Sequence, residues 1–390
     1  MVQGFKASAV AAGLKKDNAL DMALILSEKE AVAAGVFTSN KVKAAPVLLT
    51  REHVGGGKAK AIIANAGNAN ACTGEPGLND ARHTAELVSK ELGISPEEVL
   101  VASTGVIGQP LNMNLISEAI PKLANTLSAE GITSAAQAIM TTDSFAKTSY
   151  FEGRSGGKAY GILGIAKGAG MIMPDMATML CFIMSDIFIE AGDLRKALLL
   201  SVGESFNRIT VDGDTSTNDM VLVLANGMAE NGPLSEEDYQ EFSDGLRQVM
   251  GDLSRMIVKD GEGATKVVDI RIKGAHSTSD AEKAARTVAN SSLVKTAFYG
   301  QDPNWGRIIA ALGRAGIRME EGRVDIWIDD VQIVDDGLGI GVEAEKKASG
   351  KMTGKEFTVT IDLQQGSFED RVVTCDLTHD YVSINADYRT

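Results

Sequence analysis

The sequence predicts a mixed α/β fold. Short apolar runs of strand length recur along the chain, and segments with the apolar spacing of amphipathic helices lie between them. The composition, with 44% hydrophobic and 23% charged residues, is typical of a folded protein and excludes a disordered chain. A length of 390 residues suffices for two or three packed regions.

The individual elements follow from these patterns. Strands are predicted in the β-branched and apolar runs at 21–27, 60–67, 177–186, 220–227, 323–330 and 356–363. Helices are predicted at 79–92, 112–130, 191–206, 235–258 and 279–295. A further helix start is predicted in SPEEVL, where Ser95 can cap, Pro96 suits the first position and Glu98 completes a capping box. No repeat or Pro/Ser-rich linker marks a domain boundary.

Charge and cysteine usage narrow the class of protein. The formal net charge is −14, which argues against a nucleic-acid partner because phosphate binding needs clustered Lys and Arg. Cys72, Cys181 and Cys375 are widely spaced, and we expect reduced, mostly buried thiols. The first residues lack the apolar region of a signal peptide, and no apolar run approaches the roughly 20 residues of a membrane span. A cytoplasmic protein is therefore expected.

The chain offers no clear metal site. The four histidines are scattered and lack zinc-ligand spacing. The acidic segment VDGDTSTNDM (211–220) could suggest a calcium loop that starts at Asp212. It fails the EF-hand pattern, because position 6 counted from Asp212 is Thr217 instead of Gly and position 12 is Val223 instead of Glu. Asp, Ser and Thr side chains that hold their own loop are the favoured interpretation of this segment.

Two small-residue segments raise the question of catalysis. In STGVIG, Thr104 and Gly105 can present hydrogen-bond donors to a developing oxyanion, although a simple turn is the plainer interpretation. In GAGMIMPDMATMLCFIMSD (168–186), Thr178 fits an ordinary strand. It becomes a nucleophile only if the bond between Ala177 and Thr178 is cut. The new α-amino group can then act as its base, because such groups have a pKa of about 7.7 to 8.0 in reference peptides.

A series of motifs runs through the whole chain in a fixed order. These motifs are STGVIG, TTDSFAK, AKGAGMIMPDMATML, FNRITVDGDTSTND, KDGEGATK, YGQDPNWGRI and the C-terminal NADYRT. Together they resemble the ornithine acetyltransferase family of arginine biosynthesis, also called the glutamate N-acetyltransferase family. The resemblance implies layered helices and sheets like those of N-terminal-nucleophile hydrolases.

The resemblance also implies a processing step and a reaction. Self-cleavage between Ala177 and Thr178 would give an α chain of residues 1–177 and a β chain of 178–390, which remain together, usually as α2β2. Thr178 would carry the acetyl group of N2-acetylornithine to glutamate in a ping-pong reaction. No cofactor or metal is implied. No motif decides whether acetyl-CoA also serves as a donor, and we favour a bifunctional enzyme.

Site residues carry over from the family motifs by position. Thr104 and Gly105 match the oxyanion hole, and Thr178 matches the nucleophile. Substrate contacts match Thr141 or its neighbour Thr142, Lys167, Thr178, Glu262, Asn385 and Thr390. Lys167 suits a carboxylate and Glu262 an ammonium group, as an acetylated amino acid requires.

Two other functions remain open at this point. In an N-terminal-threonine amidase or aminopeptidase, water instead of glutamate would resolve the acyl-enzyme. In a metabolite-binding protein that keeps the fold without catalysis, the chain would stay uncut.

Overall fold

The molecule, a computed structural model, is described for residues 2–16, 18–173 and 179–387. Its contacts divide these residues into two compact units, residues 2–207 with 214–257 and residues 208–213 with 258–387. The units do not coincide with the predicted α and β chains, because the first unit takes in the start of the predicted β chain. Among the described residues, no helix has both the length and the apolar character that crossing a membrane requires.

The first unit holds one large sheet and its helices. Its strands are β1 (Phe5–Val10), β2 (Met22–Phe37), β3 (Lys58–Asn68), β4 (Val99–Val106), β5 (Lys147–Ser155), β6 (Lys158–Lys167), β7 (Leu180–Ser185) and β8 (Met220–Ala225). Its helices are α1 (Ala45–Val54), α2 (Gly74–Leu92), α3 (Met113–Asn125), α4 (Ile132–Ala138), α5 (Ala191–Glu204) and α6 (Glu236–Lys259).

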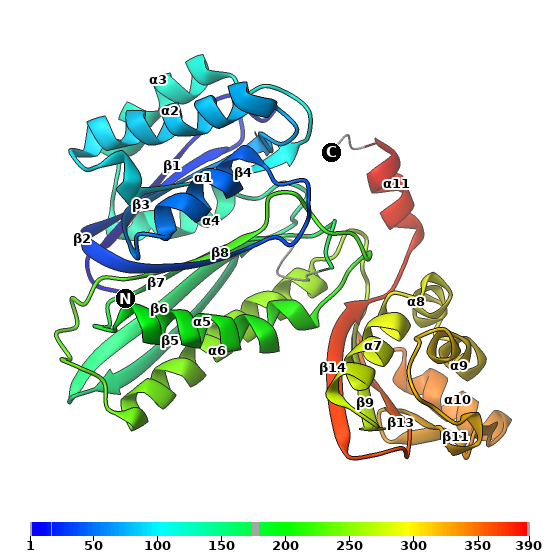
Figure 1. Cartoon of the computed structure of the whole chain (residues 1–390). Coiled ribbons are helices and arrows are strands. Elements are labelled where there is room, and N and C mark those ends of the chain that lie inside the picture. The colour runs from blue at the N-terminus through cyan, green and yellow to red at the C-terminus, as the bar shows by residue number, and fades with distance from the viewer. Residues whose placement is uncertain (1, 17, 174–178, 388–390) are drawn as a thin grey trace. The chain divides into compact units, whose positions relative to one another are not determined.

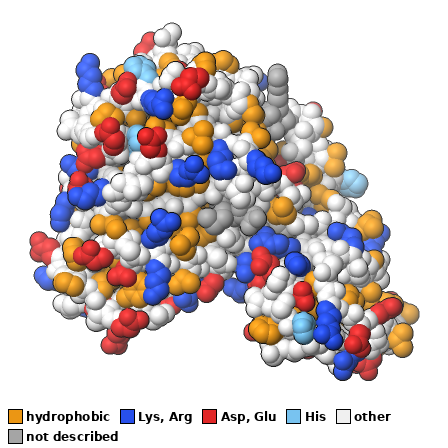
Figure 2. Space-filling model, viewed as in Figure 1, with side chains coloured by type: hydrophobic (Ala, Val, Ile, Leu, Met, Phe, Trp, Pro, Cys, Tyr) orange, Lys and Arg blue, Asp and Glu red, His pale blue; other side chains and the backbone are white. Residues whose placement is uncertain are grey.

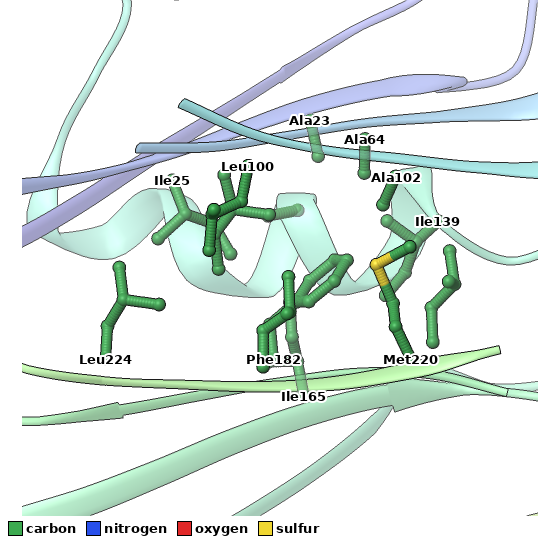
Figure 3. Packing of buried hydrophobic residues seen from close by; sticks show 14 of the residues in the cluster. Ala23, Ile25, Ala64, Leu100, Ala102, Ile139, Ile165, Phe182, Met220 and Leu224 are labelled. Atoms are coloured by element: carbon green, nitrogen blue, oxygen red, sulfur yellow. The ribbon is translucent and has the colours of Figure 1, made fainter. Parts of the chain in front are cut away.

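Strand β2 joins two halves of this sheet. The order is β4-β3-β2-β8-β7-β6-β5, with β1 also paired to β2. The first part of β2 pairs with β3 and its last six residues pair with β8, with a register shift between Leu26 and Ala31. The two halves face each other across a buried core, in which Ile25 and Leu100 lie opposite Phe182 and Leu224 (Figure 3). The sheet is therefore folded over on itself.

Helices cover both outer faces of the folded sheet (Figure 1). Helices α1, α2 and α3 share a second core with the half made of β2, β3 and β4, where Leu49 and Ile116 pack with Leu24 and Val101. Helix α6 packs on the other half so closely that a Cβ at Gly164 of β6 would lie 2.7 Å from its Leu253. The predicted mixed α/β fold in layers is confirmed.

The second unit is smaller and consists of one sheet and a layer of helices. Its strands are β9 (Val267–Ala275), β10 (Asp325–Ile328), β11 (Val331–Asp335), β12 (Leu338–Gly339), β13 (Glu356–Asp362) and β14 (Phe368–Cys375). Its helices are α7 (Thr278–Ala289), α8 (Ser292–Tyr299), α9 (Trp305–Gly313), α10 (Val342–Lys351) and α11 (His379–Asp387). The sheet order is β12-β11-β10-β13-β9-β14. Helices α7 to α10 supply residues to one core with this sheet.

Several helix predictions are wrong in detail. The predicted helix 112–130 ends early, because α3 stops at Asn125 and a separate 3₁₀ turn spans Ala129–Gly131. The predicted helix 279–295 is two helices, because Asn290 ends α7 and Ser291 precedes α8, and such short polar residues favour helix ends. The predicted helix at Ser95 is a three-residue 3₁₀ turn, although the Ser95 N–H does bond Glu98 at 2.9 Å. The apolar residues from Val99 onward instead form β4, because parallel pairing with β3 buries them.

Candidate active site

Residues far apart in the sequence meet at one end of the folded sheet. Thr104 and Gly105 lie near the end of β4, Lys167 is the last residue of β6, and Thr141 lies in the loop before β5. The Asn218 side-chain amide ties the two halves of the sheet together there, because it donates to the carbonyls of Ala69 and Ser103 at 2.6 and 2.8 Å. This end of the sheet is the candidate active site.

The Lys167 ammonium group joins two of the predicted threonines. Its Nζ donates to Thr141 Oγ1 at 2.9 Å and to Thr104 Oγ1 at 3.3 Å, and its side chain is 8% exposed. Because each threonine hydroxyl accepts a hydrogen bond from Lys167, the proton of that hydroxyl remains available for donation to another group. The structure thus brings Lys167, Thr104 and Thr141 together.

A buried carboxylate, Asp143, holds this group in place. Its Oδ1 accepts from Lys147 Nζ at 2.7 Å and from the Gly168 N–H at 2.6 Å, and its Oδ2 accepts from the Thr141 N–H at 2.9 Å. Burial raises the pKa of Asp143, but the charges of Lys167 and Lys147 outweigh burial and lower that pKa to about 2. Sequence reasoning missed this residue, although it lies within TTDSFAK and is spaced four residues before Lys147.

Replacing Asp143 should destabilise the protein. We expect Asp143→Asn to reduce the free energy of unfolding at pH 7 by about 3 kcal/mol, because two buried ammonium groups lose their counter-charge. Since the folded pKa lies below the unfolded value of about 3.9, the stability from this carboxylate is complete above about pH 4 and is lost as pH falls toward 2. Asp143→Asn should remove that loss from the acid side of a pH series of urea unfolding curves.

The control for this variant is Asp252→Asn. Asp252 is an exposed carboxylate that accepts from Ser149 Oγ at 2.8 Å. Its replacement should change stability by less than about 0.5 kcal/mol. Equal stability of Asp143→Asn and the wild type would contradict the anchoring role of Asp143.

Gly105 has a conformation and a packing that require glycine. Its φ is +131°, and an added Cβ would lie 2.3 Å from the backbone carbon of Gly67 in β3. The register of β3 and β4 shifts at this point, between Gly67 and Asn68. The Thr104–Gly105 peptide therefore departs from the regular hydrogen-bond ladder between β3 and β4. Such a departure at the candidate site suits the predicted role of these residues as oxyanion donors.

Ala177 and Thr178 lie outside the described residues, but the strand that follows them is described. Strand β7 runs from Leu180, which pairs with Lys167 in β6. The next strand starts alongside it, because the Met220 N–H bonds the Met179 carbonyl at 3.0 Å. The predicted strand is confirmed over 180–185 and begins at the same sheet end as the Lys167 group.

Asp219, the last acidic residue of the segment VDGDTSTNDM, lies directly before β8. It is fully enclosed, and burial raises its carboxyl pKa well above the usual value despite a hydrogen bond from Ser216. No hydrogen-bond partner of Asp219 Oδ2 is found among the described residues.

The second unit brings another predicted pair together. Asn385 Nδ2, on α11, donates to Glu262 Oε2 at 2.8 Å, and Glu262 is 8% exposed. The Thr378 hydroxyl steadies the Glu262 loop by donating to the Gly263 carbonyl at 2.7 Å. Thr390, the last predicted contact residue, lies outside the described residues.

The remaining predicted features have structural roles. Within the described chain, no group of three or more His, Cys, Asp or Glu residues is arranged to hold a metal ion. The acidic segment forms a self-bonded loop, in which the Asn218 N–H bonds Ser216 Oγ at 3.1 Å and Thr217 Oγ1 bonds Asn218 at 2.6 Å. All three cysteines are free; Cys181 and Cys375 are buried as expected, while Cys72 is exposed.

Comparison with known proteins decides the family. Residues 6–390 match the ArgJ family. The chain belongs to the ArgJ family. The "Arginine biosynthesis bifunctional protein ArgJ" of Geobacter sulfurreducens is 52% identical, with 100% of both chains covered. The "Glutamate N-acetyltransferase" of Methanocaldococcus jannaschii is 47% identical, with 100% of this chain and 97% of that protein covered.

A solved structure agrees with this assignment. The crystal structure of arginine biosynthesis bifunctional protein ArgJ from Bacillus halodurans is 42% identical and superimposes with a TM-score of 0.52. It covers 54% of this chain and 100% of the solved chain. The predicted family, and with it the class of ArgJ acyltransferases in arginine biosynthesis, is confirmed.

Proposed function

We propose that this chain transfers the acetyl group of N2-acetylornithine to glutamate through an acetyl ester on Thr178. The observation that carries this proposal is the hydrogen-bonded cluster of Lys167, Thr104 and Thr141. In this cluster two hydroxyls and a buried ammonium lie beside the start of β7. Polar donors fixed at one spot in a largely buried site suit the charge that develops during acyl transfer.

The proposed reaction begins with the free amino terminus of Thr178. Its α-amine takes the proton of the Thr178 hydroxyl, whose oxygen attacks the acetyl carbonyl. The hydroxyl of Thr104 and the N–H of Gly105 then stabilise the oxyanion, and ornithine leaves with the proton. The amine of glutamate attacks the acetyl ester in the second half-reaction and regenerates Thr178.

The other carried-over residues bind the amino-acid substrates in this proposal. Lys167 and Thr141 bind a carboxylate, because an ammonium and a hydroxyl are both donors. In the second unit, Glu262 binds an ammonium and Asn385 is a further substrate contact, and a 2.8 Å hydrogen bond joins the two side chains. Thr390 is proposed as a further contact.

Self-cleavage between Ala177 and Thr178 is part of the proposal. The solved Bacillus halodurans chain corresponds in full to 54% of this chain. That share agrees with a fragment from Thr178 to the C-terminus, which is 213 of 390 residues. We also propose that the two fragments assemble as α2β2, that acetyl-CoA is a second donor, and that the enzyme works in the cytoplasm.

Product analysis tests the transfer reaction. The purified protein is incubated with N2-acetylornithine labelled in the acetyl group, with and without glutamate. We expect labelled N-acetylglutamate when glutamate is present and little acetate when it is absent. Acetate release at the same rate with and without glutamate would identify an amidase and overturn the proposal. Parallel double-reciprocal plots for the two substrates are expected for the ping-pong order.

A further inference from the structure

A pocket in the first unit lies between helices α1 and α5. Its volume is about 530 Å³, within the usual range for small-molecule sites. Ala34 and Val36 of β2 form part of its lining and are buried, and Leu198 and Leu199 of α5 contribute apolar surface. We call this the α1–α5 pocket.

The charges around the α1–α5 pocket oppose the charge of the whole protein. Every ionisable residue in its lining is basic, namely Lys43, Arg51 and Arg195, although the chain carries a net charge of −14. Figure 2 shows Lys and Arg side chains along the face of the first unit on which α1 and α5 lie. Such a local concentration of positive charge attracts anionic ligands.

The two arginines are available for a ligand. Both are exposed, and neither forms an ion pair or a side-chain hydrogen bond with the described residues, whereas Lys43 donates to the Asn40 carbonyl at 2.7 Å. A guanidinium group matches a phosphate group with two parallel hydrogen bonds. Helix α5 also begins at the pocket with Ala191 and Gly192, and its N-cap residue makes no side-chain capping bond. Its first N–H groups therefore add donors for an anion.

One end of the pocket reaches the strands of the candidate active site. Thr38 lines the pocket, and its N–H bonds the Asp219 carbonyl at 3.0 Å. Strands β2, β8 and β7 are neighbours, so Thr38 and Met179 are separated by two strand spacings, roughly 10 Å. A ligand with phosphates in the pocket and a long flexible arm can span that distance.

We propose that the α1–α5 pocket binds the phosphorylated nucleotide end of acetyl-CoA. Arg51 and Arg195 bind phosphates, the apolar lining contacts the adenosine, and the pantetheine arm carries the thioester past Thr38. Thr178 Oγ then attacks the thioester carbonyl, the C–S bond breaks, and CoA leaves as a thiol with the hydroxyl proton. This inference rests on the proposed use of acetyl-CoA as a second donor.

Separate kinetics with the two donors test this site. In the Arg51→Gln/Arg195→Gln double variant, we expect the KM for acetyl-CoA to rise at least tenfold, while kcat and KM for N2-acetylornithine with glutamate stay unchanged. Acetylpantetheine, a thioester without the nucleotide phosphates, should serve the variant and the wild type equally. Arg154→Gln is the control, because Arg154 is exposed on β5 and does not line the pocket.

The possible results distinguish an error in the assignment of the α1–α5 pocket from an error in the proposed use of acetyl-CoA as a donor. An unchanged KM for acetyl-CoA, or equal losses with both donors, would overturn the pocket assignment. Adenosine 3′,5′-bisphosphate should compete with acetyl-CoA alone, whereas inhibition with both donors would identify a free-nucleotide effector and overturn the assignment.

If the wild type transfers no acetyl group from acetyl-CoA, calorimetry with adenosine 3′,5′-bisphosphate still tests whether the α1–α5 pocket binds the nucleotide. Binding that the double variant loses would support the pocket and reject only acetyl-CoA as a donor. Absence of binding to the wild type would overturn the pocket itself.

Discussion

A Thr178→Ala variant is expected to remain a single chain of 390 residues and to lose acetyl transfer by at least about 10⁴-fold. Both losses have the same cause, because the proposed hydroxyl attacks first the preceding peptide bond and later the acetyl group. The wild type should give two fragments on a denaturing gel. N-terminal sequencing of the second fragment should read Thr-Met-Leu-Cys, starting at Thr178.

Two variants control for this result. Thr178→Ser keeps a hydroxyl and should still cleave and transfer, at a reduced rate. Thr148→Ala changes an exposed threonine of β5 and should behave as the wild type. A Thr178→Ala protein that is cut, or a wild-type chain that stays uncut with full transferase activity, would disprove the proposed nucleophile.

Thr104→Val should lower kcat by about 10²- to 10³-fold, the usual cost of one oxyanion donor, about 2.7 to 4 kcal/mol of barrier. Valine keeps the branched shape but removes the hydroxyl that accepts from Lys167 Nζ at 3.3 Å. That lysine bond leaves the hydroxyl proton for the oxyanion, which exists only in the transition state. The KM for N2-acetylornithine should therefore change little.

Thr104→Ser is the matched control, because it keeps the donor and should retain most of the activity. Steady-state kinetics and thermal melting measured together separate catalysis from folding. An unchanged kcat in Thr104→Val would remove Thr104 from the oxyanion hole. A raised KM with unchanged kcat would instead assign it to substrate binding.

The strands of the fold were largely predictable, because buried runs such as 220–227 and 356–363 carry their own apolar signal. The hairpin of β5 and β6 was missed, although its turn residues Gly156 and Gly157 both have positive φ and are a hairpin signal in SGGK. The 3₁₀ turn at Ser95 was misjudged for a different reason. Its capping signal is local, whereas the pairing of β4 with β3 is tertiary and outweighs it.

The residues of the site came from motifs, and their arrangement came from the fold. No spacing rule could predict that Lys167 would meet Thr104, 63 residues away, because that contact requires the sheet to fold over on itself. Asp143 was missed because a buried ion pair has the same sequence pattern as an exposed one. Thr141, one of two adjacent candidates, is the one that the structure places on Lys167.

The central position of β7 constrains how this protein can be made. Strand β7 lies between β6 and β8, so the first strand of the predicted β chain is an inner strand of a sheet that the α chain largely builds. Translated separately, the α chain would expose the edge of β6 and the β chain that of β7, and open strand edges promote aggregation. Folding of the continuous polypeptide should therefore precede its maturation, and splitting the gene at codon 178 should yield little enzyme.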